Sequence, residues 1–322
     1  MEQNPSARLK LAIRLALLVG LPSAFALGTD HFASAPNLYA VMQSFAFLGL
    51  MSLGLSLTMI AGEFDLSIAA TATVAGLIAV KLGGGGALLG IAAAVAAGAA
   101  IGVGNAALLP WLQVSSLVTT VGSMIFLSGV GFWLAGGRVL SYDDFDASDF
   151  LDQKLGGVFS PRSLITLACY VLVSLFLRCT TLGRDIHATG GHRKAAVQSG
   201  ARVGLALTVG FAASGAFSAL GGALLSLSLA TASATSSGDA LLQAASAAIV
   251  GGVGSPLGVA TGVMILTVLN NGLGLLDASS PQILLVNGLI LMLVVLLDGR
   301  LGAAAGRLIS GRVGSRGTQD PA

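Results

Sequence analysis

Long apolar runs follow one another along almost the whole chain, separated by short polar turns. Nine runs approach the roughly 20 residues that a helix needs to cross a bilayer: residues 11–28, 38–61, 66–82, 86–109, 115–136, 161–178, 204–230, 257–276 and 281–298. A tenth run, 240–252, fits either a short crossing or a re-entrant hairpin. The runs predict an all-α, polytopic membrane protein in which residues 1–322 form a single transmembrane domain.

The composition supports a lipid environment. Hydrophobic residues make up 55% of the chain and charged residues only 9%, whereas a soluble domain normally carries about 25% charged residues. The 45 glycines suit helix packing in a bilayer, where small residues let two backbones approach closely. A net charge of +2 gives no reason to expect nucleic acid as a partner, so membrane lipid is the expected surrounding.

The basic residues predict an orientation, because Lys and Arg are enriched in cytoplasmic loops. With the N-terminus inside and run 240–252 counted as a crossing, twelve of the 16 basic residues lie inside. A re-entrant run would move the arginines of the tail, residues 299–322, to the outside. We therefore predict ten crossings with both termini cytoplasmic. The first run ends in the signal-like Ala24-Phe25-Ala26, and we expect it to remain as a signal anchor.

The predicted outer loop, residues 137–161, is the only long acidic segment. It carries the aromatic residues Tyr142, Phe145 and Phe150 together with five aspartates: Asp143, Asp144, Asp146, Asp149 and Asp152. Two interpretations stay open. The loop either keeps the chain out of the lipid as a solvated segment or offers a docking surface to an extracytoplasmic partner.

Glu63, Asp65 and Ser67 lie where two apolar runs meet with almost no loop. Acids at membrane depth are costly and commonly mark a functional pathway. Gly62 can end the first helix, and the Asp65 and Ser67 side chains can cap the next one. A simple polar turn at the cytoplasmic surface and a role in lining or gating a pathway are both compatible with this pattern.

The largest predicted cytoplasmic loop, residues 179–203, fits two short helices around a Gly190-Gly191 break, with Gly200 ending the second. Its small residues are flanked by basic ones, which suits insertion into a groove of a soluble partner; the small residues are Ala188, Ala195 and Ala196. His187 and His192 have no acid or cysteine that completes a metal-ligand set. We expect no metal site, no catalytic residue and no cofactor.

A Gly-rich turn at 249–258 precedes Asn270 and Asn271, which lie inside an apolar run. The chain contains no G-x-x-x-x-G-K-[ST] motif, so we do not expect it to bind ATP itself. The two asparagines can bond between helices or contact a solute. Both remain candidates for a pathway.

At these three places the sequence resembles the inner-membrane permeases of the ribose and simple-sugar branch of ABC importers. Residues 63–67 look like the G-x-DLS segment of that family, and residues 269–273 look like its LNNGL segment. Loop 179–203 is similar to the T-x-GR-x-x-x-A-x-GG-N-x-x-AA-x-x-SG loop of the family. It matches at Thr181, Gly183, Arg184, Ala188, Gly190, Gly191, Ala195, Ala196, Ser199 and Gly200.

The resemblance implies a permease subunit in the bacterial inner membrane that transports a small solute, a monosaccharide, by alternating access. It implies a second permease as partner, identical or different, together with a cytoplasmic ATP-binding subunit and a periplasmic solute-binding protein. The matched residues of this loop from Gly183 to Gly200 would couple the permease to the ATPase. The alternative is an ion-coupled secondary transporter in which Glu63 and Asp65 carry the ion.

Overall fold

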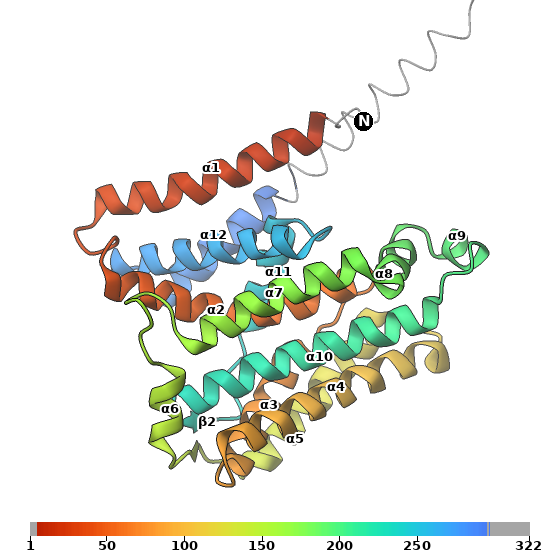
Figure 1. The fold of residues 1–322 in the computed structure, drawn as a ribbon, viewed down its shortest axis with the longest axis horizontal. Coiled ribbons are helices and arrows are strands. Elements are labelled where there is room, and N and C mark those ends of the chain that lie inside the picture. The colour runs from red at the N-terminus through yellow and green to blue at the C-terminus, as the bar shows by residue number, and fades with distance from the viewer. Residues whose placement is uncertain (1–4, 295, 297–322) are drawn as a thin grey trace, which may run out of the picture.

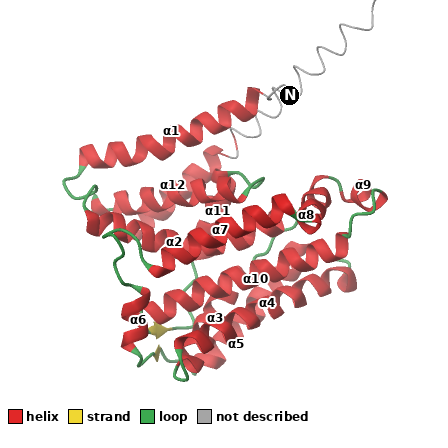
Figure 2. Ribbon diagram, in the orientation of Figure 1, coloured by secondary structure: helices red, strands yellow, loops and turns green. Residues whose placement is uncertain are grey.

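The computed structural model describes residues 5–294 and 296. Within this range the chain forms a helical bundle with two very short strands (Figure 1, Figure 2). Its elements are α1 Pro5–Gly28, α2 Ala35–Ile60, α3 Ile68–Gly83, α4 Ala87–Leu112, α5 Ser116–Ala135, β1 Leu140–Ser141, α6 Phe145–Leu151, α7 Pro161–Cys179, α8 Thr181–Gly191, α9 Arg193–Gln198, α10 Val203–Ser228, β2 Thr231–Ala232, α11 Ala240–Gly251, α12 Pro256–Leu275 and a last helix, Ser280–Val294.

Six of these helices are long and apolar enough to cross a membrane, namely α2, α4, α5, α7, α10 and α12. Four shorter apolar helices accompany them: Ala12–Gly28 within α1, α3, α11 and the last helix. These ten helices coincide with the ten predicted runs, which confirms a helical, polytopic architecture. The number of crossings and the side of each terminus stay predictions, and the predicted tail, 299–322, lies outside the described residues.

Serine caps fix where several helices begin. Ser34, Ser160 and Ser255 each accept a hydrogen bond from the backbone N–H three residues ahead, at the starts of α2, α7 and α12. A proline stands in the first turn of each of these helices, where its missing N–H has no partner to lose. Such a cap stabilises the start of a helix by about 1 kcal/mol. The serine caps and first-turn prolines therefore help to fix the residue at which each of these helices begins.

Helix α10 runs through the middle of the bundle and packs against α2, α3 and α4. Glycine is required at these contacts. A Cβ on Gly54 of α2 would lie 2.7 Å from the carbonyl oxygen of Ser214 on α10, and a Cβ on Gly98 of α4 would overlap the carbonyl oxygen of Gly215. The high glycine content therefore serves backbone-close helix packing, as predicted.

Helix α2 is mostly buried inside the protein, whereas α4 and α5 leave most of their surface exposed. The exposed side chains of α4 and α5 include large apolar ones, such as Trp111 and Trp133. Such a surface is suited to lipid. Helix α2 is thus the central element, and the two candidate regions described below lie at its two ends.

The acidic loop contains structure that the sequence did not predict. Strand β1 pairs antiparallel with β2, and the Asp144 side chain caps α6 by accepting a bond from the N–H of Ala147. The all-α prediction did not include these two strands, which form because two loops meet here and satisfy backbone groups by pairing. Burial raises the pKa of Tyr142, which follows β1, and the nearby Asp144 carboxylate raises it further.

Helices α8 and α9 lie at one end of the bundle, and α6 and β2 lie at the other (Figure 1). The N-terminal end of α1 is at the same end as α8 and α9 (Figure 1). Near it, Nε of Arg14 donates a hydrogen bond of 3.0 Å to the carbonyl of Val250, at the C-terminal end of α11. In the following we call these the α8–α9 end and the α6 end.

Candidate functional site

Asp65 lies in the turn between α2 and α3, where Gly62 has a φ of +82°. Its side chain is buried. Oδ1 accepts bonds from the backbone N–H and the hydroxyl of Ser67, at 3.0 and 2.6 Å, and Oδ2 accepts one from the hydroxyl of Ser214 at 2.8 Å. Ser67 precedes α3 without capping it through its side chain. The predicted Ser67 cap is therefore wrong, because this hydroxyl donates to Asp65 instead.

The hydrogen bonds continue from Ser67 into two further helices. Nδ2 of Asn105 on α4 donates to the Ser67 hydroxyl at 2.9 Å, and the hydroxyl of Ser123 on α5 donates to Oδ1 of Asn105. Because Ser214 belongs to α10, this group joins the α2–α3 turn to α4, α5 and α10. A satisfied polar network in a low-dielectric interior fixes geometry, which favours a bracing role for Asp65 over the carriage of an ion.

Glu63 joins the same turn to loop 179–203. Its Oε1 lies 2.7 Å from Nη2 of Arg193, and the side chains are 14% and 50% exposed, respectively. Beside this ion pair, a Cβ on Gly190 would overlap the carbonyl oxygen of Ile60 and lie 2.9 Å from the nitrogen of Gly62. The turn therefore holds the loop both by charge and by close backbone contact. No sequence pattern indicated that Glu63 and Arg193 are partners.

Loop 179–203 forms the two predicted short helices, α8 and α9. The break falls at His192, one residue later than predicted, because Nδ1 of His192 accepts the N–H of Ala195 and so begins α9. Gly200 has a φ of +82° and follows the end of α9, as predicted. The loop thus emerges from the bundle as a compact helix pair.

The residues predicted to couple the loop to a partner lie on two faces. Ala196 is 3% exposed, so its side chain lies away from the exposed face, and its role in coupling stays a prediction. Gly183 is also buried, because α8 packs there against the backbone of Leu177. The exposed positions are Arg184, Ala188, Gly190, Gly191, Ala195, Ser199 and Gly200. Val197, which the sequence analysis missed, is 60% exposed and adds an apolar side chain to the exposed part of α9.

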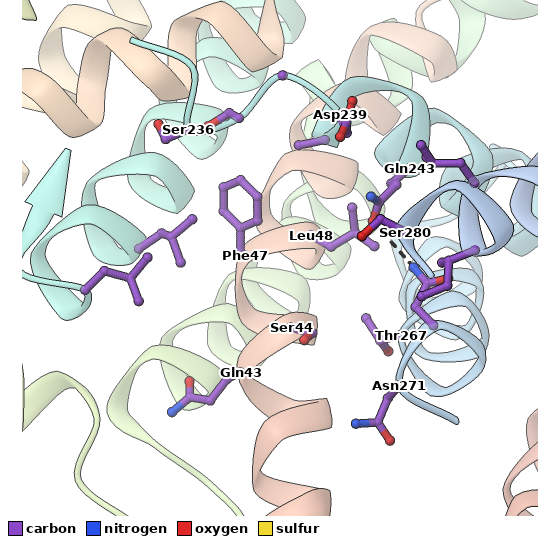
Figure 3. Close-up of a pocket in the computed structure, with 18 of the residues that line it drawn as sticks. Gln43, Ser44, Phe47, Leu48, Ser236, Asp239, Gln243, Thr267, Asn271 and Ser280 are labelled. Carbon is purple, nitrogen blue, oxygen red and sulfur yellow. Dashed lines mark hydrogen bonds between the residues drawn. The ribbon is translucent and has the colours of Figure 1, made fainter. Parts of the chain in front are cut away.

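A cavity of about 810 Å³ lies near the α6 end, among α2, α10, α11, α12 and the last helix (Figure 3). Polar side chains supply much of its lining: Gln43, Ser44, Thr235, Ser236, Ser237, Gln243, Thr267, Asn270, Asn271 and Ser280. Apolar residues such as Phe47 and Leu48 complete it. The polar groups converge from five separate segments of the chain, which is typical of a ligand site.

Asn270 and Asn271 both line this cavity. Asn271 exchanges two hydrogen bonds of 2.9 Å with Asn37 and so links α12 to α2. Asn270 is less engaged, because its Nδ2 lies 3.5 Å from Oε1 of Gln243. The predicted pathway candidates are thus divided. The two asparagines lie at the cavity, whereas Glu63, Asp65 and Ser67 lie at the other end of α2.

An ionic cluster beside the cavity escaped the sequence analysis. Arg162, in the first turn of α7, lines the cavity and is bonded to Oδ1 of Asp152. The Ser228 hydroxyl donates to Oδ2 of Asp152 at 2.7 Å. Arg162 is 5% exposed. A basic residue inside the first turn of an apolar run was the available signal, since charge is costly there without a partner.

Helix α6 and the residues just before it expose further acids of the loop. Asp143, Asp146 and Asp149 are exposed, and Phe145 and Phe150 beside them are 64% and 62% exposed. Asp152 differs from them because it is bound to Arg162. The α6 end therefore carries a surface of carboxylates and aromatic rings.

Residues 37–296 match a family described as branched-chain amino acid transport system / permease component. The chain is 28% identical over 307 residues to the ribose import permease protein of Escherichia coli K12, which covers 90% of this chain and 93% of that relative. It is 30% identical over 290 residues to the ribose import permease protein of Bacillus subtilis 168, covering 84% and 87%. The L-arabinose transport system permease protein of E. coli K12 is 29% identical over 283 residues, covering 85% and 86%. No solved structure matches the chain. Since the matched segment spans most of the chain, the protein belongs to this family of transport-system permease components.

Proposed function

We propose that the protein is the membrane subunit of an ATP-driven importer and carries a monosaccharide across the bacterial inner membrane. The observation that carries this proposal is the family match over residues 37–296, combined with a helix pair, α8–α9, held at one end of the bundle. The named functions of the relatives, import of ribose and of L-arabinose, support a monosaccharide. Because the sequence has no Walker-type motif, ATP hydrolysis belongs to a partner subunit.

All ten apolar helices cross the membrane in this proposal, with the α8–α9 end in the cytoplasm and the α6 end outside. The twelve-to-four division of basic residues supports this orientation. So does the arrangement of the bundle, since the N-terminal end of α1 and the basic loop lie together, away from acidic α6 (Figure 1). Counting α11 as a crossing is consistent with the Arg14 contact at its C-terminal end.

Coupling to ATP runs through the α8–α9 pair. Its exposed small and apolar residues, Ala195 and Val197, insert into a groove of the ATPase, with Arg184 beside them. When helices α8 and α9 move, the α2–α3 turn moves with them, because the Arg193–Glu63 ion pair and the Gly190 contact connect the two. The hydrogen bonds of the Asp65 network connect this turn to α4, α5 and α10, so these helices move as well.

Helix α2 connects this machinery to the solute. Its C-terminal end forms the turn that holds the loop, and its outer half contributes Gln43, Ser44 and Phe47 to the cavity. A shift of α2 changes both regions together, because a packed helix moves as a rigid element. Alternating access follows when ATP and the loaded binding protein stabilise different positions of this unit.

The acidic surface of α6 faces the extracytoplasmic partner in this proposal. Its exposed carboxylates favour a solute-binding protein that presents basic residues. The importer also contains a second permease, identical or different. Secondary transport by Glu63 and Asp65 fits less well, because Glu63 has an ion-pair partner and both carboxylate oxygens of Asp65 are occupied.

The proposal is tested by rebuilding the importer in liposomes from the permease, its ATPase and its binding protein. We expect uptake of the bound sugar with ATP in the ATPase compartment and no uptake driven by a proton or sodium gradient alone. The Glu63→Gln variant should retain most of this uptake. Gradient-driven uptake without ATP, abolished by Glu63→Gln, would replace the importer by the secondary transporter.

A further inference from the structure

We propose that the cavity beside α2 is a recognition site for a single uncharged polyol of sugar size, built from amide and guanidinium groups of this chain. The solute class rests on the proposed function, and the inference adds which groups hold the solute and which solutes they reject. The cavity volume of about 810 Å³ lies in the range of roughly 300–1,000 Å³ that is usual for small-molecule sites.

Asn270 supplies the first unsatisfied group. Its Oδ1 is buried and has no hydrogen-bond partner among the described residues, and its Nδ2 has only the 3.5 Å contact with Gln243. A buried polar atom without a partner is costly. A hydroxyl both donates and accepts, so a polyol hydroxyl that reaches Asn270 after a side-chain shift would supply the partner that Oδ1 lacks.

Arg162 supplies the second unsatisfied group. Its Nε is buried and unpartnered within the described part of the chain, while the other side of the guanidinium is bonded to Asp152. Arg162 lines the cavity with a guanidinium whose charge is already neutralised by Asp152. A hydroxyl oxygen fits such a donor, whereas an ionised solute would compete with Asp152.

An amino acid finds no buried, unoccupied pair of charges in the described lining. Its ammonium group needs a free carboxylate, but Asp152 is occupied by Arg162 and Ser228. Asp239, the one acid named in the lining, is exposed to solvent, where an ion pair with an ammonium group is worth little. A zwitterionic amino acid that enters the cavity loses its hydration water and gains no equivalent partner for its charges. This desolvation raises the free energy of the bound state. The cavity thus selects neutral polyols over amino acids, although the matched family is described by branched-chain amino acid transport.

Phe47 gives the cavity its apolar face. In Figure 3 its ring projects from α2 into the cavity, with Ser236 on one side and Gln243 on the other. A sugar ring has an apolar C–H face and a polar rim, and it can stack on Phe47 while its hydroxyls reach the amides. This combination of one aromatic surface and convergent polar groups specifies both ring shape and hydroxyl pattern.

Asn287 is a further buried amide close to the cavity lining. It is 5% exposed, and both its amide atoms lack partners among the described residues. It follows Ile283 and Leu284, two residues of the cavity lining, by four and three positions, so it lies on the same face of the last helix one turn further in.

The test uses the full-length permease with Cys169→Ser and Cys179→Ser and one reporter cysteine. Ser44→Cys reports on the cavity, which Ser44 lines; Ser141→Cys, exposed on β1, is the control. Alkylation by a small neutral maleimide is timed with D-ribose, L-arabinose or D-glucose, and with L-valine or L-leucine. We expect at least one sugar, and neither amino acid, to slow labelling of Ser44→Cys while Ser141→Cys is unaffected.

Asn270→Leu and Gln243→Leu, on different helices, should each raise the half-protecting sugar concentration by about tenfold. Thr208→Val is the matched control, because Thr208 is half-buried on α10 and is not among the residues that line the cavity. Protection by valine or leucine, absence of protection by every sugar, or protection unchanged in both leucine variants would overturn the site. If the reconstituted importer still drives sugar uptake in that event, only the site fails. If ATP-driven uptake is absent as well, the proposed function fails with it.

Discussion

Adjacent glycines in α8 provide the sharpest test of how the loop is attached. A methyl group on Gly190 would overlap the carbonyl oxygen of Ile60 and lie 2.9 Å from the nitrogen of Gly62, whereas a methyl group on Gly191 would meet nothing within 4 Å. The clashing atoms are backbone and cannot rotate away. Overpacking costs about 1–3 kcal/mol, and a backbone clash belongs near the upper limit. Alanine is about 1 kcal/mol more favourable than glycine inside a helix. Subtracting this gain from the cost of the clash, we expect Gly190→Ala to weaken the attachment of the loop by about 2 kcal/mol.

The assay is hydrogen exchange of residues 179–203 in the purified permease, combined with solute uptake. A loss of about 2 kcal/mol makes exchange from the opened loop about 30-fold faster, and uptake should fall because the loop no longer moves with α2. Gly191→Ala should leave exchange equal or slower, with normal uptake. Equal effects of the two variants, or unchanged exchange and uptake in Gly190→Ala, would refute attachment through the Gly190 contact.

Three further outcomes follow from the same geometry. Asp65→Ala should lower the free energy of unfolding by about 3 kcal/mol, because it leaves the donors of Ser67 and Ser214 without an acceptor. Asp65→Asn should retain much of the stability and uptake. Thermal unfolding measures the stability of both variants. A double-mutant cycle of Glu63→Gln and Arg193→Ala should give a coupling of about 1 kcal/mol or less, since Arg193 is half exposed; a larger value would mean that the pair is shielded by other contacts. Reporter fusions within 179–203 should read cytoplasmic and fusions within 137–161 periplasmic; the opposite result would overturn the orientation.

The helices could be predicted from the sequence because each apolar run must bury its own backbone bonds in lipid, which permits little besides a helix. This argument needs no tertiary information, and it located all ten apolar helices. It also located the helix pair in 179–203, since Gly200 needs a positive φ and small residues marked the ends. The strands β1 and β2 escaped it, because a two-residue ladder depends on two loops that meet only in the folded bundle.

The partners of the charged residues could not be predicted. Glu63 and Arg193 are 130 positions apart, and their pairing depends on how α8 packs against the end of α2. The same holds for Ser214, which reaches Asp65 only because α10 crosses the α2–α3 turn. The orientation of Ala196 could not be predicted either. Its small size indicated a contact surface, but size alone does not tell which face of a short helix points inward.

The central claim, that α8–α9 couples this permease to an ATPase, is tested most directly by adding bulk to the exposed face of α9. Ala195→Trp should leave the permease folded and inserted yet release the ATPase during co-purification and abolish uptake. Leu172→Trp is the matched control, because Leu172 is 64% exposed on α7, away from the loop, and it should retain both the ATPase and uptake. Normal co-purification and normal uptake in Ala195→Trp would contradict the coupling role of α8–α9.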